Sequence, residues 1–79
     1  MKVLLFAQCR EAARSDLREL SVLRPITPSD FWSLLIEACP ALAPFQKTAR
    51  LARNGGYLQS DEVLHPDDEI AIIPPVSGG

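Results

Sequence analysis

The sequence of 79 residues contains no apolar run long enough to cross a membrane. Its longest apolar runs, VLLFA and IAIIPPV, are far shorter than the roughly 20 residues that a membrane-spanning helix requires. The first ten residues already include Gln8, Cys9 and Arg10, and they lack the apolar core and small-residue cleavage site of a signal peptide. We therefore expect a cytoplasmic protein with no membrane partner.

Residues that bind metals are few and scattered. Cys9 and Cys39 form no CxxC pair and no Cys/His cluster, which argues against a zinc site or a disulfide scaffold. We expect both thiols to be reduced and Cys39 to be buried. The single histidine, His65, opens a polar turn, and the acids at 67–69 lack the glycine-bearing spacing of a calcium loop. No metal is expected, and Cys9 has no evident base that would make it a nucleophile.

Excess positive charge is also absent. Eight Lys and Arg residues stand against ten Asp and Glu residues, for a net charge of −2, and the arginines are spread among acids. A nucleic-acid partner is therefore not expected. The glycine-rich GxGxxG and phosphate-loop patterns are missing too, and no catalytic constellation replaces them.

What the sequence does contain is typical of one small globular domain spanning residues 1–79. Hydrophobic residues make up 47% and charged residues 23% of the chain. The run Lys2–Gln8 is apolar on both alternating faces and predicts a central strand. The segment Leu17–Leu23 alternates apolar and polar residues, so we expect a second strand that forms a hairpin with the first.

The segment TPSDFWSLLIEAC predicts the main helix. Thr27 is a good N-cap, Pro28 suits the first helical position, Asp30 can close a capping box, and Pro40 ends the helix. Helical spacing assigns a core stripe to Phe31, Leu34, Leu35 and Ala38. Trp32 and Ile36 lie on the rim of this stripe. They either pack under a neighbouring segment or stay exposed as a contact patch, and packing is favoured because large aromatics usually complete small cores.

The second half of the sequence predicts a connector with one helical turn at 40–45, a strand at 49–53 and a tight turn at 54–56 that leads into a short strand. A last strand is expected after the polar turn at 65–69. The first and last strands are both apolar and should be neighbours. They would then run parallel, with one helix packed across a mixed sheet.

The C-terminal segment PPVSGG is the most unusual feature. Pro74 and Pro75 stop sheet pairing, and the extended chain from Pro75 to Gly79 would reach about 16 Å. Because Gly78 and Gly79 have no side chain, such a tail could enter a narrow channel of a partner. The terminal carboxylate is a poor electrophile until adenylation supplies a leaving group, after which a sulfur donor could convert it to a thiocarboxylate. A frayed end without function is the alternative.

Two blocks resemble a known family, the small ubiquitin-like subunit of molybdopterin synthase in the MoaD/ThiS group of sulfur carriers. KVLLFAQCRE resembles the family's first strand and the loop after it, and DDEIAIIPPVSGG resembles its last turn, strand and tail. Such carriers share the Gly-Gly end, and the PPV that precedes it here is typical of the molybdopterin branch.

The resemblance implies an α+β fold of the β-grasp type and a function in molybdenum cofactor biosynthesis. A MoeB-like, E1-like enzyme would use ATP to adenylate Gly79, and a cysteine desulfurase or rhodanese would supply sulfur. The tail, extending over 75–79, would enter a MoaE-like large subunit and donate sulfur to a cyclic pterin precursor within a heterotetramer. The carrier itself would bind no cofactor and would not be a complete enzyme alone.

The resemblance implies that Gly79 carries the sulfur and that Gly78 lets the tail thread into the partner's active site. It also implies that Pro75, Val76 and Ser77 line the approach to that site. It further implies an apolar sheet face for partners, for which Phe6, Ile73 and Leu58, with Tyr57 as a possible extension, are the candidates. Simple burial of Phe6 and Ile73 is the alternative.

Four other functions remain open from the sequence. The same carrier chemistry could serve thiazole synthesis or tRNA thiolation. The chain could instead be a protein tag joined to lysines through its last glycine, or a non-catalytic β-grasp interaction module.

Overall fold

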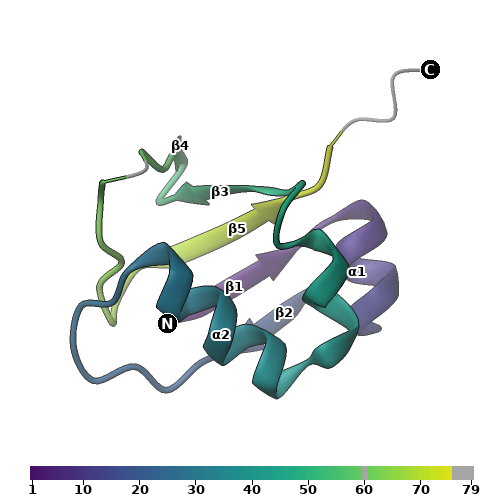
Figure 1. Cartoon of the computed structure of the whole chain (residues 1–79), viewed down its shortest axis with the longest axis horizontal. Helices are drawn as coiled ribbons and strands as arrows, with labels where there is room; N and C mark the ends of the chain where they lie inside the picture. The colour runs from purple at the N-terminus through teal and green to yellow at the C-terminus, as the bar shows by residue number, and fades with distance from the viewer. Residues whose placement is uncertain (60, 76–79) are drawn as a thin grey trace.

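The computed structural model describes residues 1–59 and 61–75. In this part of the chain, five strands form one mixed sheet in the order β2-β1-β5-β3-β4, and helical segments lie across one of its faces (Figure 1). The elements are β1 (Lys2–Leu5), α1 (Ala7–Ala13), β2 (Leu17–Glu19), α2 (Pro28–Ala38), the 3₁₀ helix η1 (Pro40–Phe45), β3 (Arg50–Arg53), β4 (Gly56–Tyr57) and β5 (Glu69–Ile73).

The first and last strands are neighbours in the middle of the sheet and run parallel, as expected. Val3 pairs with Ile70 and Leu5 with Ile72, and all four side chains are buried. Parallel pairing requires a long crossover, and here the crossover carries α2 over the sheet. The expected β-grasp fold is confirmed.

The hairpin predicted at 49–57 is also present. β3 and β4 pair through Ala52 with Tyr57 and Arg53 with Gly56. Asn54 and Gly55 between them have φ values of 49° and 91°, which is the left-handed conformation that a two-residue hairpin turn demands. Asn and Gly tolerate this conformation better than other residues, so the NGG pattern correctly located the turn.

The prediction that the first strand continues to Gln8 is wrong. β1 ends at Leu5, and α1 begins two residues later. Its sequence, AQCREAA, consists mostly of strong helix formers, and it buries Cys9 and Ala13, which lie four residues apart on one face. Seven residues are too few for a clear helical period, which is why this helix was missed.

The second strand is also shorter than predicted. β2 pairs antiparallel with β1, as expected, but the two strands are joined by α1 rather than by a tight turn. β2 ends at Glu19, Leu20 still exchanges backbone hydrogen bonds with Met1, and the residues after Leu20 run beside α2. Leu20 is buried there, whereas Leu23 is 97% exposed. The alternation of apolar and polar residues over Leu17–Leu23 therefore covers a strand and a loop rather than one strand.

Both predicted ends of α2 are confirmed. The Thr27 hydroxyl accepts a hydrogen bond from the Asp30 backbone N–H at 3.1 Å, and Pro28 is the first helical residue. The helix ends at Ala38, and Pro40 begins the helical turn expected in the connector, which is the 3₁₀ helix η1.

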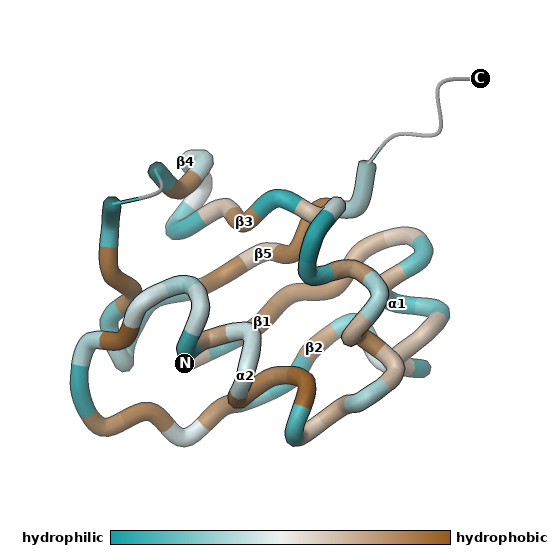
Figure 2. The backbone as a smooth tube through the Cα atoms, viewed as in Figure 1, coloured by the Kyte–Doolittle hydropathy of each residue, from teal (hydrophilic) through white to brown (hydrophobic). Residues whose placement is uncertain are grey.

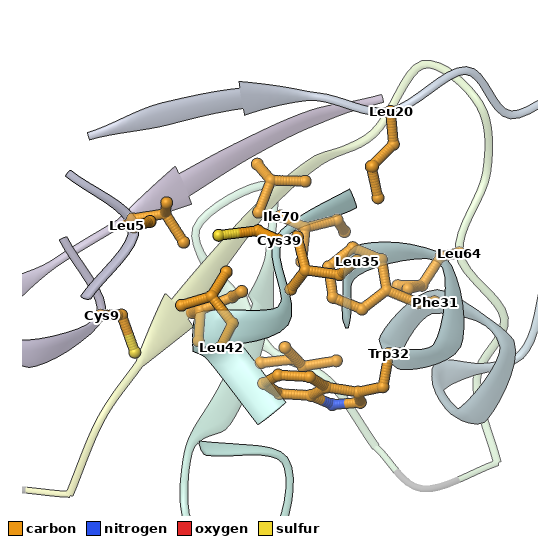
Figure 3. Close-up of a cluster of buried hydrophobic side chains, with 14 residues drawn as sticks. Leu5, Cys9, Leu20, Phe31, Trp32, Leu35, Cys39, Leu42, Leu64 and Ile70 are labelled. Atoms are coloured by element: carbon orange, nitrogen blue, oxygen red, sulfur yellow. The ribbon is translucent and has the colours of Figure 1, made fainter. Parts of the chain in front are cut away.

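The core stripe of α2 is rotated relative to the prediction. Phe31 and Leu35 are fully buried, but Leu34 is 39% exposed and Ala38 is also exposed. The additional buried position is Trp32, which points into the same cluster as Phe31 and Leu35 (Figure 3). The prediction that Trp32 packs is thus confirmed. The rotation has a physical cause, because η1 packs beside α2 and extends the apolar environment toward Trp32.

The long connection from β4 to β5 is attached to the sheet by Arg53. Its guanidinium donates to the backbone oxygen of Val63 at 2.7 Å and pairs with the carboxylate of Glu62. The polar turn predicted at 65–69 closes through Asp68, whose carboxylate accepts from the His65 backbone N–H at 2.8 Å. Glu62 and Asp68 therefore have structural partners. Among residues 1–59 and 61–75, no three His, Cys, Asp or Glu side chains are grouped to hold a metal.

No helix in the described ranges combines the length and the apolar character that crossing a membrane would need.

The rotation of α2 predicts different stabilities for two neighbouring leucines. Leu35→Ala should lower the free energy of unfolding by about 3 kcal/mol, because it opens a cavity in the core. The matched control Leu34→Ala removes the same atoms from an exposed position and should cost less than about 1 kcal/mol. Urea denaturation followed by circular dichroism measures both. Equal losses would contradict the orientation of α2.

Candidate functional site: the open sheet face and the root of the tail

Within residues 1–59 and 61–75, the helical segments lie across one face of the sheet and none lies across the other. The buried strand residues Val3, Leu5, Ile70, Ile72 and Leu51 belong to a single core cluster with side chains from the helical segments. Successive residues of a strand point to opposite faces, so the residues between these positions lie on the other face. Figure 2 shows that β1 and β5 remain largely hydrophobic along their length, which leaves apolar side chains for the open face.

A continuous row of apolar residues crosses this open face from one edge to the other. The strand registers place these residues side by side in the order Leu17, Leu4, Ala71, Ala52 and Tyr57. We call them the apolar row. Leu17 is 42% exposed, and Tyr57 at the other end is exposed too. Leu4 and Ala71 are half-buried and Ala52 is buried, so the row is exposed mainly at its two ends. An apolar strip that spans a sheet and is exposed at its ends is typical of a protein-binding surface.

Charged side chains border the apolar row. The strand registers place Lys2 between Glu19 on β2 and Glu69 on β5, so these three charged residues form a line along one flank of the row. On the opposite flank the guanidinium of Arg50 lies 3.9 Å from the ring centroid of Tyr57. This cation–π contact holds the Tyr57 ring at the sheet surface. An apolar centre with a polar rim is the usual composition of a protein interface.

The C-terminal ends of β1 and β5 meet at one end of the face. Because these strands are parallel and in register, Phe6 and Ile73 leave the sheet at the same place. A groove of about 450 Å³ lies here, which we call the tail-root groove. Its lining includes Phe6, Ala7, Gln8, Glu11, Ile73 and Pro75. Pro74, which also lines it, is buried, whereas Pro75 is exposed, so the chain leaves the body of the domain between these two prolines.

The structure brings together three of the predicted site residues. Phe6, Ile73 and Pro75 all line the tail-root groove, and Phe6 is 48% exposed, so the alternative that it is simply buried is wrong. Ile73 is half-buried. Tyr57 lies on the same open face, at the end of the apolar row.

Leu58 lies elsewhere. It is half-buried against the core cluster, and strand alternation directs it away from the open face. Its role in partner binding stays a prediction. The roles assigned to Val76, Ser77, Gly78 and Gly79 lie outside the described residues.

Sequence reasoning missed Leu17, Leu4, Ala71 and Ala52 as parts of one surface. Their alternation within each strand was visible, but alignment across strands depends on the registers, which the sequence does not give. The aligned pairs are Leu4 with Leu17 and with Ala71.

The two cysteines are free and buried, which confirms the prediction for Cys39. Burial raises the pKa of the Cys9 thiol above its ordinary value of 9.0, so this thiol stays protonated at neutral pH. The Cys39 sulfur lies 3.8 Å from a guanidinium nitrogen of Arg18, which is a hydrogen-bond donor and not a base. A protonated, buried thiol is a poor nucleophile, so Cys9 is not expected to react. Both cysteines belong to the hydrophobic core cluster.

Comparison with known proteins decides the family, because the model of the ThiS family matches residues 3–79. The chain belongs to the ThiS family. A relative from Chlamydomonas reinhardtii, named molybdopterin synthase sulfur carrier subunit, is 40% identical over 81 residues, which cover 100% of this chain and 98% of that protein. This ThiS-family chain thus matches a sulfur carrier over its whole length.

Solved structures agree with the fold. SAMP1 from Haloferax volcanii superposes with a TM-score of 0.84 at 31% identity, covering 99% of this chain and 97% of that one. A further neighbour comes from the complex of subunits 1 and 2 of the molybdopterin-converting factor of Helicobacter pylori. It has a TM-score of 0.68 at 16% identity and covers 99% and 96% of the two chains. At that identity the likeness concerns the fold alone.

Burial of Cys9 predicts a pH dependence of stability. The folded state holds the thiol proton more tightly than the unfolded chain, so stability is complete below pH 9 and is lost as pH rises through the folded-state pKa. The loss should approach about 1.4 kcal/mol per pH unit while only the unfolded thiol is ionised. Urea denaturation at about pH 8 and about pH 10.5 measures it. Cys9→Ala should show a smaller decrease than the native chain, and identical decreases would contradict the assignment.

Proposed function

We propose that this chain is the sulfur carrier subunit of molybdopterin synthase and that its C-terminal Gly79 carries the sulfur as a thiocarboxylate. The observation that carries the proposal is the 40% identity, over the whole chain, to a relative that bears this name. The sequence PPVSGG and the apolar surface beside the exit of the tail fit the same role.

Loading would begin on an E1-like adenylating enzyme of the MoeB type. A carboxylate oxygen of Gly79 attacks the α-phosphorus of ATP, and pyrophosphate leaves. A sulfide equivalent from a cysteine desulfurase or a rhodanese then attacks the acyl carbon, and AMP leaves with the bonding electron pair. If the sulfur arrives as a persulfide, a second thiol must reduce the acyl disulfide that forms. The product is a terminal thiocarboxylate, which is ionised and nucleophilic at neutral pH.

Unloading would take place in a MoaE-like large subunit, within a heterotetramer. The tail from Pro75 to Gly79 can extend about 16 Å, so the reactive end can enter a channel while the sheet face stays outside. The thiocarboxylate sulfur attacks an electrophilic carbon of the cyclic pterin precursor, and the oxygen substituent of that carbon leaves with the bonding electron pair. Water then attacks the acyl carbon, the acyl C–S bond breaks, the sulfur stays on the pterin, and the carrier leaves as a carboxylate. The chain thus acts as the sulfur-donating part of a sulfurtransferase and binds no cofactor of its own.

The domain would hold the tail in a defined position during both steps. β5 is paired with β1 up to Ile72 and with β3 up to Ile73. Pro74 and Pro75 cannot donate the hydrogen bonds that would continue this pairing. Two free thiols, Cys9 and Cys39, fit a reducing compartment and support a cytoplasmic location.

A second candidate function is protein modification. It is favoured by the likeness to SAMP1, which is titled small archaeal modifier protein 1 in a second Haloferax volcanii structure. The adenylation step would be the same, but a lysine amine would replace sulfur as the nucleophile. In thiazole synthesis or tRNA thiolation, the same thiocarboxylate chemistry would apply and only the acceptor of the sulfur would differ.

The proposal predicts a change in the intact mass of the protein. Incubation with the activating enzyme of the same genome, ATP and a sulfide source should raise the mass by the difference between one sulfur and one oxygen. A chain extended by one alanine beyond Gly79 is the control and should keep its mass, because its acyl end no longer reaches the nucleotide.

The native chain failing to gain sulfur, while a control carrier is charged, would overturn the proposal. A modifier would instead appear in cells as isopeptide-linked adducts on lysines. Such adducts, with no thiocarboxylate, would favour the second function.

The apolar row predicts which leucine contributes to partner binding. Leu17→Asp should weaken binding to the large subunit at least tenfold, because it places a charge in an apolar interface. Leu23→Asp is the matched control, since Leu23 is exposed but lies beside α2 and away from the open face. Isothermal titration calorimetry with the large subunit of the same genome measures both. Equal affinities for the two variants would contradict the role of the open face.

A further inference from the structure

The tail-root groove is a binding surface distinct from the apolar row. One side consists of Ile73 and Pro75, where the chain leaves β5, and the other consists of the start of α1. Any molecule that occupies this groove therefore contacts both the domain and the first residue of the tail. Occupation of the groove would fix the direction in which the tail leaves the domain.

A left-handed residue shapes the groove. Ala7 has φ of 48°, a conformation that residues other than glycine adopt rarely. It lies between Phe6, which is extended, and the rest of α1. The sharp change of direction starts the helix soon after the strand, so that Gln8 and Glu11 line the groove together with Pro75. The short side chain of Ala7 keeps the space between them open.

The groove is mainly apolar, but one charge borders it. Among the residues that line it, Glu11 is the only one with an ionisable side chain. Glu11 is exposed, and no ion pair to it occurs within the described residues. A ligand that fills the groove must therefore combine an apolar group with a positive charge placed near the Glu11 carboxylate.

We propose that Glu11 is a specificity residue for the partner that receives the tail. The tail-root groove accepts an apolar side chain from a segment of that partner, and an Arg or Lys of the same segment pairs with Glu11. This inference rests on the proposed function and takes the large subunit of molybdopterin synthase as the occupant. The groove adjoins the surface assigned to that partner, and the tail leaves from the groove, so a protein that encloses the tail must cover it.

Charge variants of Glu11 test the electrostatic part. Isothermal titration calorimetry with the large subunit of the same genome should show about tenfold or greater weakening for Glu11→Lys and about threefold weakening for Glu11→Gln. The matched control Glu37→Lys makes the same charge change on exposed α2, beside a different groove, and should bind within about twofold of the native chain. Added salt should weaken the native chain more than Glu11→Gln.

The outcomes separate this inference from the proposed function. If the native chain and Glu11→Lys bind the large subunit equally well, the inference about Glu11 is wrong but the proposed function stands. A native chain that binds no large subunit overturns the proposed function, and the inference with it. Circular dichroism and urea denaturation of each variant show whether the fold is intact, and an exposed helix position should change stability by less than about 0.5 kcal/mol.

A photo-crosslinking side chain at Gln8 identifies the occupant directly. With the large subunit present, mass spectrometry should recover a partner peptide that contains an apolar residue close to an Arg or Lys. A crosslink to residues 76–79 of the same chain, unchanged by adding the large subunit, would mean that the tail occupies its own groove, and the inference would be wrong.

Discussion

The parallel pairing of β1 with β5 is the constraint on which the rest of the structure depends. It brings the two most apolar segments, which lie at opposite ends of the sequence, into the middle of one sheet. It requires a crossover, and the crossover supplies the helix that covers the core face. It also makes both strands end on the same side, which gathers Phe6 and Ile73 at the exit of the tail. Core, open face and tail exit thus follow from one register.

One face of the sheet packs the core and stabilises the fold, and the other face is available for partner binding. The core face is fully used by Phe31, Leu35 and their neighbours, so the domain folds around side chains that no partner needs to touch. The open face keeps apolar residues that contribute little to the core, and substitutions there can alter partner choice at small cost to folding.

Much of this architecture was predictable from local sequence patterns. The cap at Thr27, the turn at Asn54 and Gly55, and the parallel central strands all followed from residue type and order. What failed depended on packing between elements. α1 was too short to show a period, and the buried face of α2 was set by its contact with η1. For the candidate site, Phe6, Ile73 and Pro75 were found by resemblance, whereas the apolar row required registers that no single segment encodes.

The same parallel register separates the two ends of the chain. Lys2 pairs with Glu69 at the start of β5, so the first residue lies a full strand length, about 16 Å, from the point where the tail leaves. The amino group of Met1 donates a hydrogen bond to the backbone oxygen of Leu20 at 2.9 Å and lies 3.9 Å from a carboxylate oxygen of Glu19. An N-terminal fusion would turn this amine into an amide, which keeps one N–H donor but loses the charge that pairs with Glu19. Such a fusion would lie at the other end of the domain from the tail exit and would not obstruct it. A second domain or an affinity tag is therefore better joined to the N-terminus.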